Sequence, residues 1–235
     1  MKTVIDRASS RGYFNHGWLK THHTFSFADY HNPNRVHFGA LRVLNDDIVA
    51  PSEGFGTHPH QNMEVVSIPL QGHLRHGDSV QNTQTITVGD IQVMSAGTGI
   101  FHSEYNGSST EPVSFLQIWI IPREQDTPPA YANYDIRGLM KPNELSLILS
   151  PDGQTPASIR QDAWFSLGEL DKGVKTGYKL HGQGHGVYVF LIEGRISVAG
   201  QTLERRDGLG IWDVTDIEIE ALENAKILLM EVPMF

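Results

Sequence analysis

Short apolar segments bounded by Gly, Pro, Asn or Asp recur along the whole chain, and no window longer than two helical turns shows a convincing i, i+3, i+4 periodicity of apolar residues. This pattern predicts β-strands rather than helices. Many short, evenly spaced strands are typical of sandwiches and barrels, so we expect an all-β protein. The predicted strands are Phe38–Asn45, Glu64–Leu70, Thr83–Thr87, Ile91–Ser95, Ser114–Ile121, Ser146–Leu149, Val187–Ile192, Arg195–Val198, Gly210–Asp213, Ile217–Glu220 and Lys226–Val232.

The two halves of the chain resemble each other loosely. Glu64–Gly72 and Val187–Gly194 are both apolar strands that end in a polar residue and glycine, and each precedes a second strand, a turn and another apolar strand. Such a repeat suggests two related β-barrels. The Pro-rich segment Pro122–Pro142 is the candidate linker. We therefore expect an N-terminal barrel over residues 1–122, a linker over 123–142 and a C-terminal barrel over 143–235.

Composition narrows the functional classes. The 235 residues are 39% hydrophobic and include no cysteine, which excludes disulfides, thiolate metal ligands and a cysteine nucleophile. A formal charge of −9 disfavours direct binding of nucleic acid. No apolar run has the length of a membrane span, and none near the N-terminus has that of a signal peptide. We expect a cytoplasmic protein that binds neither membrane nor nucleic acid.

Two short blocks carry the candidate chemistry. His58 and His60 are separated by one residue, and so are His102 and Glu104. Residues i and i+2 of a strand point to the same face, so two neighbouring strands would aim four side chains at one point. Three imidazoles and a carboxylate suit a divalent transition metal and leave coordination positions open. Pro59, which has no N–H, suits a strand at a sheet edge.

Other interpretations compete with this one. A single histidine is better explained as a surface or hydrogen-bonded residue, and we interpret His31, His37, His73 and His76 in that way. His58 and His60 alone could be a chance pair in a chain with 12 histidines. The second pair, about 40 residues later, favours an adjacent antiparallel strand and hence a metal site.

The same blocks resemble a known superfamily. The run Gly54-Phe-Gly-Thr-His-Pro-His-Gln-Asn-Met-Glu64, followed by Gly72, resembles the first cupin motif, and the run from Gly89 to Asn106 resembles the second. His-Pro-His and Gly-x-x-His-Ser-Glu are similar to the pirin family, most closely its bacterial members. Asn15-His-Gly-Trp18 and Gln117-Ile-Trp119 are also pirin-like. The resemblance covers nearly the whole chain and is looser in the second half. Ser95 in place of the usual cupin proline is a departure that the pirins share.

The resemblance implies a bicupin, in which two antiparallel jelly-roll β-barrels lie face to face and only the N-terminal barrel binds metal. It implies the ligands His58, His60, His102 and Glu104, although Glu64, a ligand in many cupins, competes with Glu104. It further implies a metal-dependent dioxygenase that cleaves the central ring of quercetin-type flavonols with O2. The preferred ion is Fe(II), with Mn, Ni, Co, Cu or Zn also compatible. Glu104 is the candidate catalytic base, and its alternative role is ligation alone.

Other functions stay open at this point. One is a non-catalytic iron-binding regulator that acts as a transcriptional cofactor through protein contacts, and another is a cupin isomerase or small-molecule binder. We expect a monomer, because the two barrels can pair within one chain. Flat aromatic substrates favour apolar pocket walls. The candidates for those walls, each of which could equally be ordinary core, are Phe25, Phe27, Phe55, Met63, Phe101 and Trp119. Asn15–Pro33 is either a lid or an arm packed on the outer sheet.

Overall fold

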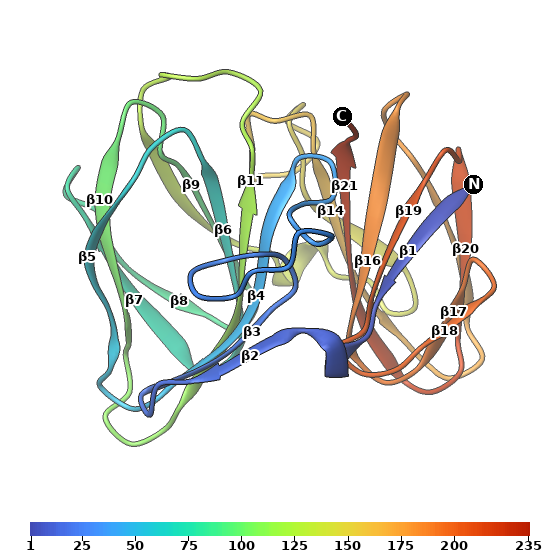
Figure 1. Ribbon diagram of the computed structural model, residues 1–235, viewed down its shortest axis with the longest axis horizontal. Coiled ribbons are helices and arrows are strands. Elements are labelled where there is room, and N and C mark those ends of the chain that lie inside the picture. The colour runs from blue at the N-terminus through green and yellow to red at the C-terminus, as the bar shows by residue number, and fades with distance from the viewer.

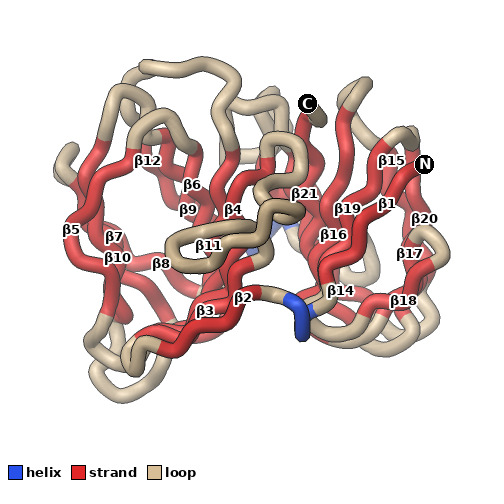
Figure 2. Tube along the Cα trace, in the orientation of Figure 1, coloured by secondary structure: helices blue, strands red, loops and turns tan.

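The structure, a computed structural model that describes residues 1–235, contains 21 β-strands and two short 3-10 helices, Ala8–Ser10 (η1) and Arg137–Leu139 (η2). The all-β prediction is confirmed (Figure 2). Each of the eleven predicted strands coincides with an observed one. The largest shift concerns Phe38–Asn45, because Phe38 and Leu41 form a bridge across a tight turn and the strand itself runs over Leu41–Val49. No helix in the fold combines the length and hydrophobicity that crossing a membrane requires.

The N-terminal half is built from a seven-stranded and a four-stranded antiparallel sheet (Figure 1). In spatial order, the larger sheet contains β12 (Ala130–Asp135), β9 (Asp90–Ser95), β6 (Glu64–Gln71), β11 (Val113–Ile120), β4 (Leu41–Val49), β3 (Leu19–His23) and β2 (Gly12–Asn15). The smaller sheet contains β5 (Gly54–His60), β10 (Ile100–Asn106), β7 (His73–Asp78) and β8 (Thr83–Thr87). β5 lies at the sheet edge, so Pro59, which is level with Phe101 of β10, has no strand on its outer side.

The C-terminal half repeats this arrangement with a six-stranded and a four-stranded antiparallel sheet. The larger sheet contains β1 (Lys2–Asp6), β19 (Gly208–Trp212), β16 (His185–Glu193), β21 (Ala225–Pro233), β14 (Trp164–Leu170) and β13 (Leu145–Leu149). The smaller sheet contains β15 (Lys175–Lys179), β20 (Asp216–Ala221), β17 (Ile196–Val198) and β18 (Gln201–Leu203). Two double-sheet halves of this kind form the expected bicupin.

The largest hydrophobic core lies between the two large sheets. Leu116, Ile118 and Ile120 alternate along β11, and they belong to the same 26-residue cluster as Tyr188 and Phe190 of β16. Because side chains alternate across a strand, the residues between them face the interior of their own half. The two halves therefore pack face to face through their large sheets (Figure 1).

The interiors of the two halves differ in chemistry. The C-terminal interior is filled by a cluster of 16 buried, mostly aliphatic residues. The N-terminal interior contains two smaller clusters, of six and four residues, one around Phe115 and the other around Met94. Buried polar side chains such as Ser67, His102 and Gln117 occupy the same interior. The N-terminal interior therefore combines apolar packing with buried polar groups that can hold a ligand.

Two strands cross the boundaries that the sequence predicts. Residues 123–142 contain β12, which pairs with β9 and extends the N-terminal sheet, so this segment is more than a linker. Its Pro-rich approach and its half-buried edge position hide the strand pattern. β1 pairs with β19, so residues 2–6 belong spatially to the C-terminal half. The N-terminal sheet therefore extends past residue 122, and the C-terminal sheet includes the first strand of the chain.

Glu64 joins the two halves. Its carboxylate is buried and accepts hydrogen bonds from Ser95 Oγ at 2.9 Å and from the backbone N–H groups of Arg160 and Gln161, both at 2.8 Å. The loop Gln61–Met63 separates β5 from β6, so the strand parity of His58 and His60 does not extend to Glu64. The Glu64 side chain therefore points toward the C-terminal half, away from the histidines.

Replacing Glu64 by alanine should lower the free energy of unfolding by about 2–4 kcal/mol, because three donors would lose a charged acceptor. Urea unfolding monitored by tryptophan fluorescence measures the change. Glu53→Ala, which removes an exposed carboxylate, is the matched control. A Glu64→Ala protein as stable as this control would mean that the carboxylate does not hold the halves together.

Candidate metal centre

The candidate site is built on three neighbouring strands, β5, β10 and β7. His102 of β10 lies opposite His58 of β5 on one side and Asp78 of β7 on the other, and Glu104 lies opposite His76. The β5–β10 register shifts between His102 and Glu104, which is the signature of a bulge. All five side chains thus project into the interior of the N-terminal half.

Three imidazoles converge there. The ring centroids of His58, His60 and His102 lie 4.4–4.9 Å apart, and one ligand nitrogen from each falls within 4.8 Å of the other two. His58 Nδ1 lies 2.8 Å from the Gly56 carbonyl oxygen, to which it donates. That bond leaves His58 Nε2 as the free acceptor, 3.1 Å from His60 Nε2. Two nitrogens at this separation suit neighbouring positions around one ion at about 2.1 Å.

The cluster fits a metal ion on a second ground. Both ring nitrogens of His102 are buried and have no hydrogen-bond partner. Burial lowers the pKa of His60 to about 4 and that of His102 to about 2, with the neighbouring histidines adding to the effect. Both rings are therefore neutral near pH 7, the form that binds a cation. A metal ion would give a partner to the unprotonated nitrogen of His102.

Glu104 lies deeper than the imidazoles. Its carboxylate accepts hydrogen bonds from Gln117 Nε2 at 2.7 Å and Ser67 Oγ at 3.1 Å. Burial raises the pKa of Glu104, and the two hydrogen bonds and the nearby His58 oppose that rise. Glu104 forms a group within 4.8 Å with His102 and His76, whereas His58 and His60 lie outside this group. The structure thus brings the four predicted ligands into two clusters that share His102.

His76, which the sequence analysis interprets as an ordinary histidine, lies inside the site. Its Nε2 is 3.2 Å from Asp78 Oδ2, and its ring stacks on Tyr131 of β12 at a centroid distance of 4.1 Å. His76 Nδ1 and the Tyr131 hydroxyl are buried without partners. His76 and Asp78 have the same i, i+2 spacing as the two predicted ligand pairs. The sequence therefore contained a pattern that could have placed His76 in the site. Tyr131 was hidden by the assignment of its segment to a linker.

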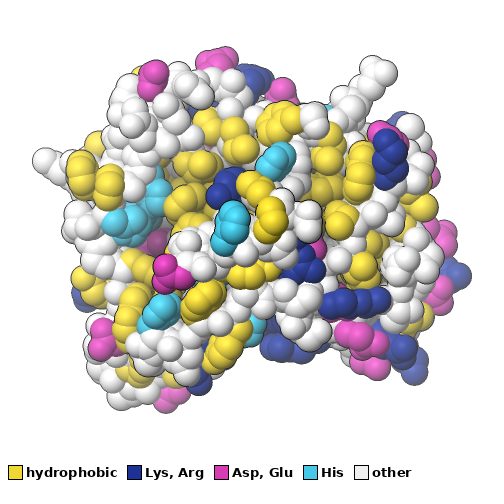
Figure 3. Space-filling model, in the orientation of Figure 1, with side chains coloured by type: hydrophobic (Ala, Val, Ile, Leu, Met, Phe, Trp, Pro, Cys, Tyr) yellow, Lys and Arg dark blue, Asp and Glu magenta, His cyan; other side chains and the backbone are white.

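The aromatic residues predicted to line the pocket divide into two groups. Trp119 stands at 88° to the His60 ring with centroids 4.8 Å apart, and Phe27 packs edge-on against Trp119 at 5.2 Å. Phe25, by contrast, belongs to the core between the halves. Figure 3 shows histidine side chains gathered on the outer part of the N-terminal half, beside hydrophobic surface. Phe101, 54% exposed, lies on the outer face of β10 rather than in the site interior.

The remaining two candidates, Phe55 and Met63, pack against other small clusters. Phe55 lies edge-on to Trp18 with centroids 5.2 Å apart, and Met63 packs on the cluster around Met94. The segment Asn15–Pro33, predicted to be either a lid or an arm, contains β3. This strand pairs with β4 and therefore extends the large sheet as an arm. Phe27 lies in the loop that follows and reaches Trp119. The segment is therefore a packed arm whose final loop borders the site.

The apoprotein should lose stability as the pH falls from 6.5 toward 4. The unfolded chain protonates its histidines near pH 6.5, whereas folded His60 and His102 stay neutral, so the unfolded state binds more protons in this window. The free energy of unfolding should decrease by up to about 1.4 kcal/mol per pH unit for each histidine. Urea titrations of chelator-treated protein at several pH values measure this slope. The His102→Gln protein should show a smaller slope than the unaltered protein, whereas the exposed control His31→Gln should not. Equal slopes in the two variants would contradict the buried, neutral state of His102.

Comparisons with known proteins agree with this geometry. Residues 5–120 match the Pirin family model, and residues 147–232 match that of the quercetinase C-terminal cupin domain. A relative from Escherichia coli K12 named quercetin 2,3-dioxygenase is 40% identical over 97% of this chain and 98% of its own length. A pirin-like protein from Caulobacter vibrioides is 39% identical over 97% of this chain and 99% of its own.

Among solved structures, the Escherichia coli bacterial pirin YhhW in complex with nickel(II) matches with a TM-score of 0.94 and 38% identity, covering all of both chains. The sequence identity to these relatives extends over almost their full length. It agrees with the face-to-face double-sheet architecture and with the histidine cluster of the N-terminal half. The chain belongs to the pirin family, within the cupin superfamily.

Proposed function

We propose that this protein is a metal-dependent dioxygenase that opens the central ring of quercetin-type flavonols with O2. The observation that carries the proposal is the convergence of His58, His60 and His102 on one point inside the N-terminal half, with both nitrogens of His102 unpaired. Glu104 supplies the carboxylate of the proposed ligand set. The names of the relatives from Escherichia coli support the reaction class.

The proposed ion is Fe(II). The same nitrogen and oxygen donors also accept Mn, Ni, Co, Cu and Zn, and the Escherichia coli relative crystallised with nickel(II). The bound ion would act as a Lewis acid and template for the flavonol 3-hydroxyl and for O2. Glu104 is the proposed acceptor of the 3-hydroxyl proton, because Gln117 and Ser67 hold its carboxylate next to His102. The proposed products are a depside and carbon monoxide.

The surroundings suit a flat aromatic substrate. Trp119 and Phe27 provide an apolar wall beside His60. The unpaired Tyr131 hydroxyl and His76 Nδ1 provide polar groups in the same cavity. Apolar walls with a few directed polar groups are characteristic of small-molecule sites, and the polar groups orient the ligand. We propose that the flavonol ring packs against Trp119.

Replacing His102 by alanine should remove the bound ion, because this residue belongs to both ligand clusters. Elemental analysis of the purified protein measures metal per chain. His73→Ala, three residues from His76 on β7 and absent from both clusters, is the matched control and should retain the ion. Full metal content in the His102→Ala protein would refute the proposed ligand set.

Turnover tests the activity directly. Protein loaded separately with each candidate metal is mixed with quercetin in air, and the loss of flavonol absorbance is followed together with carbon monoxide release. We expect turnover with at least one metal. Full metal occupancy without turnover for every ion would contradict the dioxygenase proposal and favour the iron-binding regulator.

Glu104→Gln should lower kcat by about 100-fold or more, the contribution expected of a general base. Metal content, measured on the same sample, separates a lost base from a lost ligand. Glu64→Gln is the matched control, since it alters a second buried glutamate that points away from the histidines. A Glu104→Gln enzyme with unchanged kcat would exclude the base role.

A further inference from the structure

A second cavity lies between the two halves, outside the histidine site. Its volume is about 460 Å³, within the range of small-molecule pockets. Asp46 and Ile48 of β4 line it, whereas Asp47 between them belongs to the opposite face of the strand. The wall from the C-terminal half is made by Glu193 at the end of β16 and by Arg205 and Arg206 in the β18–β19 turn.

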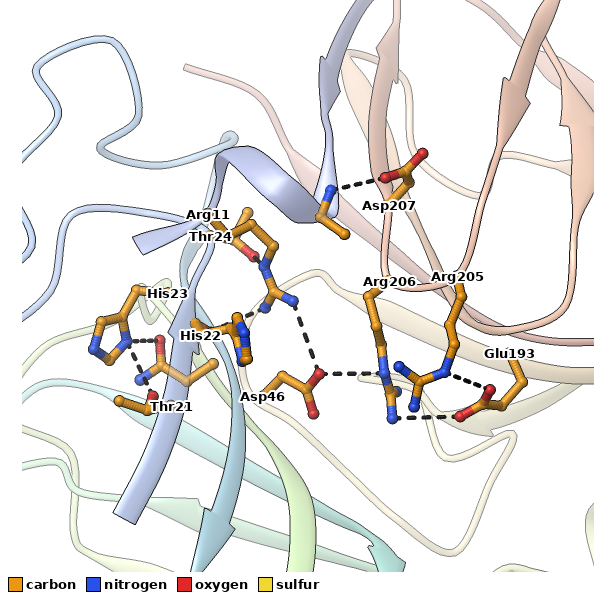
Figure 4. Close-up of polar contacts among 12 residues, drawn as sticks. Arg11, Thr21, His22, His23, Thr24, Asp46, Glu193, Arg205, Arg206 and Asp207 are labelled. Atoms are coloured by element: carbon orange, nitrogen blue, oxygen red, sulfur yellow. Dashed lines mark hydrogen bonds and ion pairs between the residues drawn. The ribbon is translucent and has the colours of Figure 1, made fainter. Parts of the chain in front are cut away.

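A chain of alternating charges runs along this cavity (Figure 4). Asp46 Oδ2 lies 3.9 Å from Arg11 Nη1 and 3.2 Å from Arg206 Nε. Glu193 lies 3.5 Å from Arg206 Nη2 and 2.7 Å from Arg205 Nε. Three guanidinium groups therefore share two carboxylates, which leaves a local surplus of one positive charge in a chain whose net charge is −9.

No other charged group at the cavity cancels this surplus. His22 also lines the cavity, and burial together with Arg11 lowers its pKa, so the ring is neutral near pH 7. Arg11 is anchored, since its Nε donates to Thr24 Oγ1 and its Nη2 to the His22 carbonyl oxygen. Its position is thus set by the N-terminal half, and the ligand-facing donors must come from the other arginines.

Arg205 and Arg206 retain unused donors. Arg206 Nη1 is buried without a hydrogen-bond partner, and Arg205 is 59% exposed with only Nε bonded. Arg206 also adopts φ +68°, a left-handed conformation that costs a non-glycine residue about 1 kcal/mol or more. Asp207 fixes this turn through hydrogen bonds from the N–H groups of Ala8 and Glu204. The fold therefore holds an arginine at a position where glycine would be less strained.

The wall from the N-terminal half offers an apolar patch. Ile48, 41% exposed, lies there with Leu70 and Pro112, and the polar Gln71 and Ser114 lie beside them. The cavity therefore presents a cationic wall and an apolar patch to the same ligand. A guanidinium matches the two oxygens of a carboxylate. A single negative charge would neutralise the local surplus, whereas a phosphate dianion would exceed it.

We propose that this cavity is a second ligand site, which binds a small organic monocarboxylate. The carboxylate pairs with Arg205 and Arg206, and the apolar body of the ligand packs on Ile48 and Leu70. The site stands apart from the proposed dioxygenase chemistry, since none of the four proposed metal ligands lines it. Binding alone tests it, without turnover.

The probe is benzoate, titrated into zinc-loaded protein and followed by backbone amide NMR. We expect saturable shifts at Gln71, Ser114 and Arg206, which line the cavity. Arg205→Gln should weaken benzoate binding about tenfold or more, because it removes a charged donor from an exposed position. Ile48→Glu should also weaken it, since a carboxylate would then occupy the apolar patch while all arginines remain.

The matched control is Arg123→Gln. Arg123 is half-exposed and paired with Asp162, and it lies beyond the far end of β11, a strand about 25 Å long that begins at Val113. The Arg123→Gln protein should bind benzoate with the affinity of the unaltered protein. Absence of saturable shifts, or equal affinity in the Arg205→Gln and unaltered proteins, would overturn the proposal. Benzyl alcohol binding as tightly as benzoate would refute the charge pairing, and inorganic phosphate doing so would refute the apolar contact.

Discussion

The candidate site depends on the register of β10 between β5 and β7. Because side chains alternate along each strand, this register brings His102 level with His58 and Asp78, and Glu104 level with His76. A slip of one residue would turn His102 and Glu104 outward and replace them with Phe101 and Ser103. Aliphatic packing of Ile100 and Leu74 at the two ends of the site opposes such a slip.

The contrast between the two halves shows how one architecture supports two outcomes. In the C-terminal half, Glu231 is also buried and lies beside two histidines, His181 and His185. Its carboxylate, however, already accepts hydrogen bonds from both rings, from Tyr178 and from backbone N–H groups, and those hydrogen bonds lower its pKa to about 2 despite burial. In the N-terminal half, the His102 nitrogens have no such partners. A satisfied cluster stabilises a loop, whereas an unsatisfied one is suited to a ligand.

Much of the fold and part of the site could be predicted because strand periodicity is local. His58, His60, His102 and Glu104 each have a partner two residues away, so their shared face follows from the sequence alone. The contact of Tyr131 with His76 could not be predicted in this way, because it depends on β12 joining β9 across a Pro-rich segment. The direction of Glu64 was equally hidden, since it depends on N–H groups nearly 100 residues later in the chain.

β4 connects the two cavities. Its inner face carries Asp47, whose pKa is raised to about 7 mainly by burial, with Asp46 and Glu104 contributing. Its outer face carries Asp46, which pairs with Arg206. The two aspartates are adjacent in sequence, but their side chains point to opposite faces of the sheet because side chains alternate along a strand. One sheet thus forms a wall of both the histidine cavity and the inter-barrel cavity. The alternation of this single strand explains why a polar interior and a charged interface coexist on its two faces.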